Sequence, residues 1–298
     1  SVPGKNIYLN LDVRLQKVAD EAMTGESGAV IIMNPKTGEI LGLASYPDFD
    51  PNLFSGGIDQ VNWNILLENP EHPLENKSIQ GLYAPGSIFK VVTSYSGLEQ
   101  SVISPEDEYF CDGEFFVTGR TDPYKCWKEG GHGRVNLVNA IKGSCNIYFY
   151  NVGMEVGVDQ MHKYARTFGL GKITGIGLLN EKEGIIPSSK WKKRELNEPW
   201  YEGENPTMAI GQGFIIVTPL QVLNMINILA NDGIWVPPKL FLKQEGPQPQ
   251  RIKLKQEYLE LIRKGMVAVV NEIGGTARKV QFEEFTVAGK TATSQVVS

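Results

Sequence analysis

The sequence is poor in cysteine, in long apolar runs and in excess positive charge, and each shortage excludes a class of protein. Three cysteines in 298 residues are too few, and odd in number, for a disulfide scaffold. No window approaches the roughly 18 consecutive apolar residues of a membrane-spanning helix, so the chain as given does not span a membrane. The 29 basic and 34 acidic residues leave a net charge of −5, which gives no sign of nucleic-acid binding. What remains is a globular chain, 41% hydrophobic, whose length suits one large domain or two modest ones.

The first third of the chain predicts a short helix and a hairpin. Apolar residues keep helical spacing after Asp12, so the first element is expected to be an amphipathic helix ending near residue 22. Two strand-like runs, 29–33 and 39–44, flank a turn-forming segment and predict a β-hairpin. Residues 47–82 have no sustained period and are expected to be mostly loop.

The rest of the chain predicts three further helices and a strand. Residues 88–98 are apolar on most sides, which indicates a buried helix. Thr-Pro-Leu-Gln at 218–221 forms a capping box that opens a second helix. A third helix is expected at 256–271, where one face is apolar, and residues 285–288 are strand-like.

A serine and a lysine one helical turn apart open the buried helix. Ser87 and Lys90 stand at i and i+3, so the amine can reach the hydroxyl. If burial and nearby positive charge lower its pKa, Lys90 can take the proton of Ser87 and make it a nucleophile. The helix N-terminus places the Ser87 backbone N–H where an oxyanion would form.

Two more polar pairs complete a pattern typical of serine acyltransferases. Ser144 and Asn146 can relay a proton to a leaving amine and hold a substrate amide. Lys290 and Thr291 supply a cation and a hydroxyl for a substrate carboxylate. Ser87 alone fits an N-cap as well as a catalytic role, and Ser144 and Asn146 alone fit a turn or a cap better. The order and context of the fragments favour catalysis.

Chance matches to the same fragments occur elsewhere in the chain. Ser189 and Lys192 also fit Ser-x-x-Lys, but they lack the Pro-Gly entry and the following apolar helix, and their neighbourhood is strongly basic. Residues 36–38 match Lys-Thr-Gly better than 290–292 do, but Pro35 and Gly38 are sufficient to explain them as a hairpin tip.

Taken together, these motifs resemble the transpeptidase domain of class B penicillin-binding proteins. The resemblance is carried by Tyr-Ala-Pro-Gly-Ser-Ile-Phe-Lys at 83–90, Ser-Cys-Asn at 144–146 and Gly-Lys-Thr at 289–291. Further runs look like the elongation-specific penicillin-binding protein 2 type: 131–136, 199–203, 210–213 and 218–221. The similarity covers essentially the whole chain.

The resemblance implies an α+β fold of the penicillin-binding/serine β-lactamase-like transpeptidase type. It implies an antiparallel sheet flanked by helices plus a helical subdomain, with the active-site cleft between them. A single transpeptidase domain is expected over residues 1–298, with 101–210 contributing much of the helical subdomain.

The implied reaction is peptidoglycan D,D-transpeptidation. Ser87 attacks the penultimate D-Ala carbonyl of a stem peptide, D-Ala leaves, and an amine of a neighbouring stem resolves the acyl-enzyme. β-Lactams acylate the same serine, and the backbone N–H groups of Ser87 and Thr293 form the oxyanion hole. No organic cofactor is implied.

The implied partners are the glycosyltransferase and scaffold proteins of the cell-elongation machinery. The implied location is the periplasmic, extracytoplasmic face, with the full-length protein anchored in the cytoplasmic membrane by a segment absent from this chain. The chain opens with Ser1 rather than Met, as a processed or excised fragment does.

Two departures from the family pattern stand out. The family has Gly after Lys-Thr, and here Ala292 stands at that position, where an added methyl can hinder docking. Related domains also continue past the position of Ser298 with further strands and a helix, so a truncated chain is expected.

Two other functions are compatible with parts of this pattern. A class A β-lactamase needs Glu-x-x-Leu-Asn to activate the deacylating water, but Lys193 stands where the Glu would precede Leu196 and Asn197. A non-catalytic scaffold or β-lactam sensor would keep the fold, and Ala292 is the feature that favours it.

The three cysteines cluster within 35 residues and suggest a shared site. Cys111, Cys126 and Cys145 with His132 are a complete tetrahedral donor set for structural Zn²⁺, and the glycines around His132 let the chain turn tightly. A disulfide plus one free thiol, or three inert buried thiols, are the alternatives. The resemblance favours zinc, since some elongation-type relatives bind it at matching positions. If 144–146 is extended, alternation directs Cys145 away from the cleft that Ser144 and Asn146 face.

Overall fold

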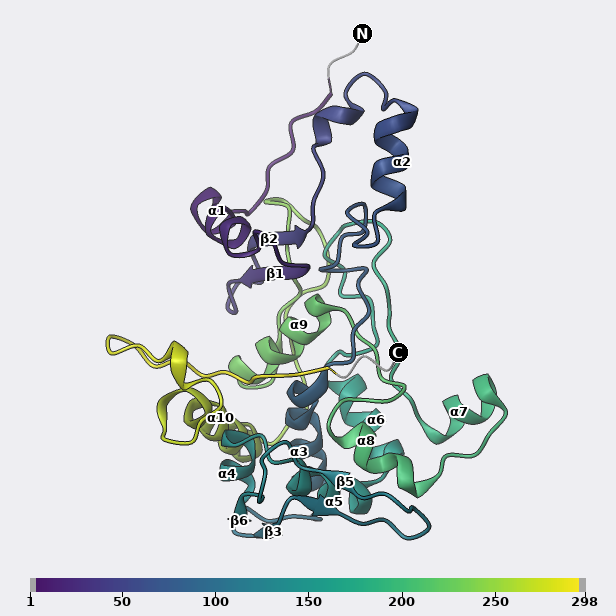
Figure 1. Cartoon of the computed structure of the whole chain (residues 1–298). Coiled ribbons are helices and arrows are strands. Elements are labelled where there is room, and N and C mark those ends of the chain that lie inside the picture. The colour runs from purple at the N-terminus through teal and green to yellow at the C-terminus, as the bar shows by residue number, and fades with distance from the viewer. Residues whose placement is uncertain (1–3, 295–298) are drawn as a thin grey trace. The chain divides into compact units, whose positions relative to one another are not determined.

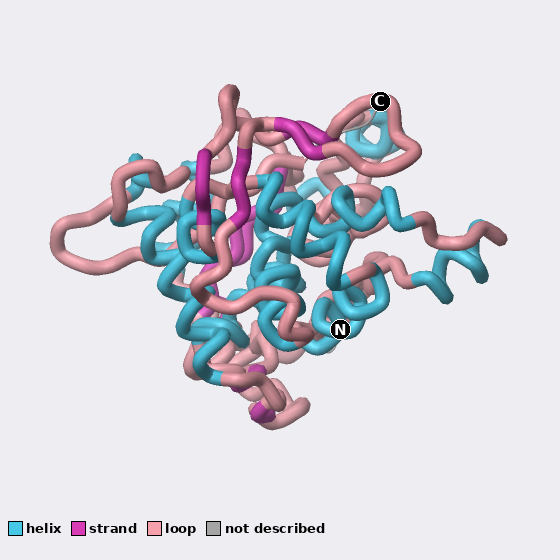
Figure 2. Tube along the Cα trace, turned by 90° about the horizontal axis from the view of Figure 1, so that it is seen from below, coloured by secondary structure: helices cyan, strands magenta, loops and turns pink. Residues whose placement is uncertain are grey.

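The computed structural model describes residues 4–294 and divides into two compact units (Figure 1). Unit 1 combines the chain up to Leu82 with Lys172–Glu183 and Thr218–Gln250. Unit 2 combines Tyr83–Gly171, Gly184–Val217 and the chain from Arg251 onward. Figure 2 shows that helices make up most of the regular structure and that the strands are short. No helix among the described residues is long and apolar enough to cross a membrane.

Unit 1 contains the predicted N-terminal helix and hairpin. Helix α1 (Val13–Ala22) begins after Asp12, whose side chain accepts a hydrogen bond from the Arg14 backbone N–H. Strands β1 (Gly28–Met33) and β2 (Ile40–Tyr46) pair in antiparallel register, which confirms the hairpin.

The segment 47–82 holds more structure than its sequence predicts. It contains a short 3₁₀ helix, η1 (Pro51–Phe54), and helix α2 (Gln60–Glu68). Asp59 caps α2 by accepting hydrogen bonds from the backbone N–H groups of residues 61 and 62. None of the α2 side chains is buried, so the helix has no apolar stripe that periodicity could reveal.

The remaining elements of unit 1 follow the predicted capping box. Thr218 accepts a hydrogen bond from the Gln221 backbone N–H and starts helix α9 (Pro219–Ala230), as predicted. Strand β7 (Ile234–Trp235) is two residues long, and β8 (Gln250–Arg251) has its first residue in unit 1 and its second in unit 2. The core of the unit joins residues distant in sequence: Ile40, Ile79, Ile176, Leu220 and Leu240.

Unit 2 is built around one buried helix. The 3₁₀ turn η2 (Gly86–Phe89) runs into α3 (Lys90–Glu99), which is buried at every position from Lys90 to Leu98. At its centre the Tyr95 ring packs against the rings of Tyr164, Phe168 and Tyr258. The helix that carries the Ser-x-x-Lys motif is therefore held on all sides, as its composition predicts.

The other elements of unit 2 lie around α3 or extend from it. They are β3 (Tyr109–Cys111), β4 (Glu114–Phe115), β5 (Tyr124–Lys125), β6 (Gly133–Val135), α4 (Leu137–Lys142), α5 (Asn146–Val156), α6 (Val158–Thr167), α7 (Ser189–Leu196), η3 (Glu202–Glu204), α8 (Asn205–Ala209), α10 (Gln256–Asn271) and η4 (Arg278–Val280). The predicted helix at 256–271 is confirmed as α10.

The predicted strand at 285–288 is wrong for the described residues. This segment runs without regular structure, because its backbone is bonded to α10 rather than to a neighbouring strand. The Asn271 side chain donates to the Val287 carbonyl at 2.7 Å, and the Gly289 N–H donates to the Met266 carbonyl at 3.0 Å. The strands among the described residues pair only as two-stranded sheets. The described part of the chain is therefore a helix-rich α+β structure that has no wide sheet.

Candidate functional site

A cavity of about 420 Å³ in unit 2 brings together most of the predicted catalytic residues. We call it the catalytic cavity. It is lined by Ser87, Trp127, Ser144, Asn146, Ile210, Gln212, Thr276, Thr291, Ala292 and Thr293. These residues come from η2, the loop after β5, the start of α5, the loop after α8 and the segment after α10, so only the folded chain assembles them.

Ser87 lies on η2, where the backbone packs closely against two other segments. Gly86 has a φ of +54°, and a Cβ built there would lie 2.7 Å from the carbonyl oxygen of Thr293. The Gly86 N–H also donates to the Gly211 carbonyl at 2.9 Å. Only glycine fits this position, and its absence of a side chain brings the Thr293 backbone beside Ser87.

Lys90 is completely buried and binds the second motif. Its Nζ donates to the Ser144 carbonyl at 2.9 Å, to Ser144 Oγ at 3.1 Å and to Asn146 Oδ1 at 2.8 Å. Within residues 4–294 no hydrogen bond joins Lys90 Nζ to Ser87 Oγ, so the amine is held on Ser144 and Asn146 one helical turn from Ser87. Burial, and secondarily the positive charge of Lys290, hold the pKa of Lys90 well below its usual value.

Lys290 approaches the same serine from the C-terminal segment. Its Nζ donates to Ser144 Oγ at 2.9 Å and to the Thr291 carbonyl at 2.9 Å. Burial lowers the pKa of Lys290 to about 8. Ser144 Oγ thus accepts from two lysines, which leaves its own proton free to be donated into the cavity.

The tripeptide 144–146 is not extended, so the condition stated for strand alternation is not met. Ser144 has a φ of +52°, Cys145 is the N-cap residue of α5, and Asn146 is the first residue of that helix. This turn nevertheless directs Ser144 and Asn146 to the cavity while Cys145 is buried behind them. Ser144 and Asn146 thus face the cavity and Cys145 does not, as strand alternation would also have placed them. The arrangement is produced by a helix N-terminus instead.

Two lining residues were not singled out from the sequence. Trp127 lines the cavity, and its indole N–H donates to the carbonyls of Gly143 and Ser144 at 3.0 and 3.1 Å. The Thr276 and Thr291 hydroxyls lie 2.7 Å apart. Neither residue belongs to a recognisable motif; the only sequence signal is that Trp127 directly follows Cys126.

The three cysteines and His132 also meet, next to the catalytic motif. Their ligand atoms all lie within 4.8 Å of one another, and all three cysteines are free thiols. His132 Nδ1 lies 3.6 Å from Cys111 Sγ and 3.4 Å from Cys126 Sγ. Tetrahedral zinc, with bonds of about 2.3 Å to sulfur and about 2.0 Å to nitrogen, separates such atoms by about 3.6 Å, so the donor set fits zinc.

The orientation of His132 suits a metal ligand as well. Its Nε2 lies 3.1 Å from the Gly143 carbonyl oxygen and donates to it, which leaves the lone pair of Nδ1 facing the thiols. Hydrogen bonding from the Cys145 thiol holds the pKa of Cys126 far below its usual value. Burial raises the pKa of Cys111. One thiolate is therefore already favoured in this cluster.

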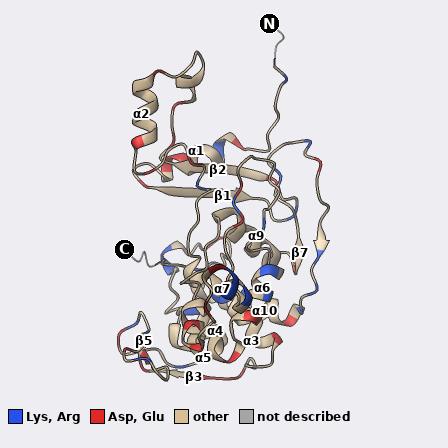
Figure 3. Cartoon of the chain, turned by 90° about the vertical axis from the view of Figure 1, so that its right-hand side faces the viewer, with Lys and Arg blue, Asp and Glu red and all other residues tan. Residues whose placement is uncertain are grey.

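The two chance motif matches, 189–192 and 36–38, lie outside the catalytic cavity. Ser189 Oγ donates to Asp159, and Lys192 pairs with Glu204 at 2.6 Å, so these residues do not form a serine–lysine pair. Figure 3 shows several Lys and Arg residues, coloured blue, on the ribbon of α7. Residues 36–38 form the turn between β1 and β2 in unit 1.

A family model described as the penicillin binding protein transpeptidase domain matches residues 28–298. The chain belongs to this family. The match confirms the family that the sequence motifs resemble.

Individual members of the transpeptidase family agree with this assignment. The chain is 35% identical to the peptidoglycan D,D-transpeptidase MrdA of Escherichia coli K12, over 98% of this chain and 48% of that protein. It therefore spans about half the length of this curated relative.

Solved structures of penicillin-binding protein 2 share the fold. The Pseudomonas aeruginosa protein in complex with WCK 5153 superposes with a TM-score of 0.93 at 35% identity, covering 99% of this chain and 69% of that chain. The Helicobacter pylori protein in complex with MreC gives a TM-score of 0.93 at 35% identity, covering 97% and 55%. The implied transpeptidase fold and the resemblance to the penicillin-binding protein 2 type are both confirmed.

Proposed function

We propose that this chain is the catalytic part of a peptidoglycan D,D-transpeptidase that cross-links stem peptides through a Ser87 acyl-enzyme. The observation that carries the proposal is that two lysine side chains contact the hydroxyl of the same serine, Ser144. Lys90 Nζ and Lys290 Nζ lie 3.1 and 2.9 Å from Ser144 Oγ, in the wall of the cavity that Ser87 also lines. The names of the relatives agree with this activity.

Acylation begins with removal of the Ser87 proton by neutral Lys90. The lowered pKa of Lys90 favours its neutral form, which has two N–H groups and one lone pair. The two N–H groups would stay on the Ser144 carbonyl and Asn146 Oδ1, and the lone pair would turn from Ser144 Oγ to the Ser87 hydroxyl at i−3. Ser87 Oγ then attacks the carbonyl carbon before the terminal D-Ala. Ser144 donates a proton to the departing amine and is reprotonated by Lys90, while Asn146 holds the substrate amide.

Charge in the transition state is stabilised by backbone and side-chain donors. The N–H groups of Ser87 and Thr293 would form the oxyanion hole, and the close approach at Gly86 supports this pairing. Protonated Lys290 and the Thr291 hydroxyl would bind the terminal carboxylate of the donor peptide.

We also infer that Cys111, Cys126, His132 and Cys145 hold a structural zinc ion. The support is the spacing of the four ligand atoms and the hydrogen bond of His132 Nε2 to Gly143. When bound, the ion would supply folding energy rather than chemistry, since all four coordination positions are taken by protein. Its contribution to catalysis would be to fix the turn that carries Ser144.

The partners and location follow from the family in the same way. The Helicobacter pylori relative was solved with MreC. For this protein we propose association with the scaffold and the glycosyltransferase of the elongation machinery, and a location at the periplasmic side of the cytoplasmic membrane. The membrane anchor would lie in a part of the protein outside this chain.

Intact-mass analysis after penicillin treatment tests the proposed function. One penicilloyl adduct, mapped to the peptide containing Ser87, is expected, together with release of D-Ala from a D-Ala-D-Ala peptide. An adduct that is lost within seconds would favour a β-lactamase instead. An adduct formed without any turnover of the peptide or of a thioester analogue would favour a β-lactam sensor.

A further inference from the structure

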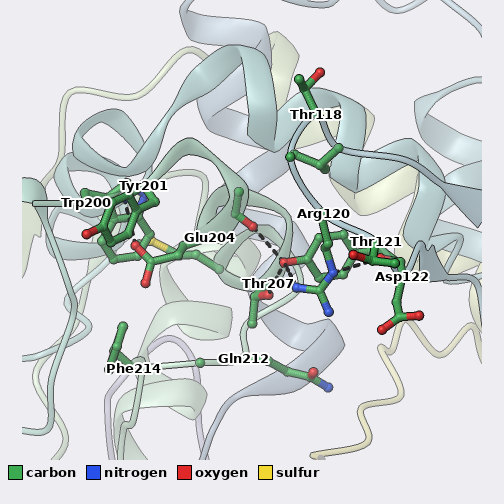
Figure 4. A pocket seen from close by; sticks show the side chains of 16 residues that line it. Thr118, Arg120, Thr121, Asp122, Trp200, Tyr201, Glu204, Thr207, Gln212 and Phe214 are labelled. Atoms are coloured by element: carbon green, nitrogen blue, oxygen red, sulfur yellow. Dashed lines mark hydrogen bonds between the residues drawn. The ribbon is translucent and has the colours of Figure 1, made fainter.

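A second cavity of unit 2 continues from the catalytic cavity. It has a volume of about 740 Å³ and is lined by segments 117–124 and 200–214 (Figure 4). We call it the aromatic cavity. A joining cavity of about 440 Å³ shares Asn146 and Gln212 with the catalytic cavity, and Tyr124 and Thr207 with the aromatic cavity. A continuous path therefore leads from Ser87 to the aromatic cavity.

One wall of the aromatic cavity is fixed by a buried cation. Lys192 is 2% exposed, and its Nζ lies 2.6 Å from Glu204 Oε1. The same ammonium lies 4.7 Å from the ring centre of Tyr201, 5.7 Å from that of Trp200 and 5.6 Å from that of Phe214. The ion pair and the three cation–π contacts hold the aromatic side chains in one arrangement, as a preformed binding wall requires.

The joining cavity carries positive charge and no carboxylate among its lining residues. Its two charged members are Arg120 and Lys125. Arg120 Nε donates to the Asp122 carbonyl at 2.9 Å, and Nη1 donates to the Tyr124 hydroxyl at 3.1 Å, so the guanidinium is held over the Tyr124 ring. Its other N–H groups, on an exposed side chain, are available to a carboxylate of a ligand.

We propose that the joining and aromatic cavities bind the acceptor strand of transpeptidation. The inference rests on the proposed function and adds the second substrate to it. The ligand is a second stem peptide, whose carboxylate pairs with Arg120 and whose apolar part lies against the aromatic wall. Its primary amine then points past Asn146 and Gln212 toward the acyl group on Ser87.

The resulting step is balanced within the site. The amine nitrogen attacks the acyl carbonyl carbon, a C–N bond forms, and the ester bond between that carbon and Ser87 Oγ breaks. The proton that the amine loses passes through Ser144 and Lys90 to Ser87 Oγ. Only a neutral amine is nucleophilic, and the positive charges of Arg120 and Lys125 disfavour its protonated form along the path.

The donor strand has its own position, so the two substrates do not compete for one cavity. Lys290 and Thr291 bind the donor carboxylate on the side of the C-terminal segment in our proposal. The joining cavity instead meets the catalytic cavity at Asn146, Ile210 and Gln212. Acylation therefore tests the donor side alone, and the transfer of the acyl group to an amine tests the acceptor side.

The charge reversal Arg120→Glu separates these two half-reactions. The donor is a D-Ala-D-Ala peptide thioester analogue, and the acceptor probe is a tripeptide with one side-chain primary amine and free carboxylates. The ratio of amide product to hydrolysis product is measured against acceptor concentration, and penicillin acylation is measured separately. Half-saturation by the acceptor should need about tenfold more peptide in the variant. Penicillin acylation should change by less than about twofold, as expected for an exposed position.

Two further variants make the result specific. Arg120→Lys should recover part of the acceptor affinity, and Arg120→Gln should lie between Lys and Glu. Lys264→Glu is the matched control, because it reverses an exposed charge on α10 that lines none of the three cavities. An acceptor dependence that is the same in Arg120→Glu and the parent overturns the inference, and so does an equal loss of penicillin acylation. A parent protein that is never acylated overturns the proposed function instead.

Discussion

His132 Nε2 lies 3.1 Å from the carbonyl oxygen of Gly143, the residue that precedes Ser144. The contact is tight, because a Cβ on residue 143 would lie 3.0 Å from Cδ2 of the imidazole. The His132 side chain, whose Nδ1 faces the thiols, therefore packs directly on the peptide unit before the turn at Ser144. Any group that fixes His132 also fixes the position of Ser144 and its contacts with Lys90.

This arrangement predicts that the metal cluster and β-lactam acylation are coupled. Cys111→Ser and His132→Ala should each lower the melting temperature and the acylation rate, although neither residue lines the catalytic cavity. The reason is that a structural zinc ion contributes folding energy directly, and the turn at Ser144 loses its support without it. Thermal unfolding, acylation kinetics and elemental analysis of protein purified without added metal give the three measurements.

Thiol titration distinguishes the alternative for the same cysteines. About one zinc per chain, with all three thiols protected until a chelator is added, is expected. Less than about 0.2 zinc per chain together with one free thiol would support a disulfide and end the zinc hypothesis.

Substitution of Ser87 and Lys90 should separate the nucleophile from its base. Ser87→Ala should abolish labelling by penicillin. Lys90→Ala should lower the acylation rate at least about 10²-fold, the usual scale for loss of a proton-transfer group. Ser189→Ala is the control and should label normally, because the hydroxyl of Ser189 is bonded to Asp159. Labelling at Ser189 in the Ser87→Ala protein would contradict the assignment.

The two lysines predict a bell-shaped pH profile of acylation. The rate should rise with pH as Lys90, whose pKa is lowered, becomes neutral and able to accept a proton. It should fall as pH passes about 8, where Lys290 loses the charge that binds the carboxylate.

Lys290→Met should remove the alkaline limb. It should also move the acid limb to higher pH, since the loss of a nearby positive charge raises the pKa of Lys90. An acid limb that moves to lower pH would refute this electrostatic coupling.

Local signals in the sequence were sufficient where one short segment decides the structure. The capping box at Thr218 and the buried helix after Ser87 are confirmed, since a cap or an apolar surface is legible in a few residues. Order and spacing also predicted the candidate catalytic set, and the fold brings Ser87, Ser144 and Asn146 to one cavity.

Other features depend on contacts that no local pattern records. Helix α2 has no buried face, so periodicity did not reveal it. The segment around Val287 reads as a strand, but its carbonyl is bonded to Asn271 of α10. The turn at Ser144 has no local signal, because a positive φ at a serine is uncommon and cannot be predicted from its neighbours. Trp127 was missed because its role arises from two carbonyl contacts near the cluster.

Ala292 provides the last prediction, because the resemblance implies a glycine, without a methyl group, at this position. Ala292 is exposed and lines the catalytic cavity between Thr291 and Thr293, which are assigned to carboxylate binding and the oxyanion hole. Ala292→Gly should therefore raise the second-order rate of penicillin acylation, by removing a methyl from the path of the docking ligand, without changing the labelled residue. Stopped-flow acylation kinetics measure the effect.

Glycine also loosens the backbone of this segment, which has no regular secondary structure. Ala288→Gly is therefore the matched control, because Ala288 is exposed but lies outside the cavity lining. Faster acylation in Ala292→Gly alone supports a steric role of the methyl group. If both variants slow acylation equally, the methyl is accommodated and backbone order is what the alanine provides.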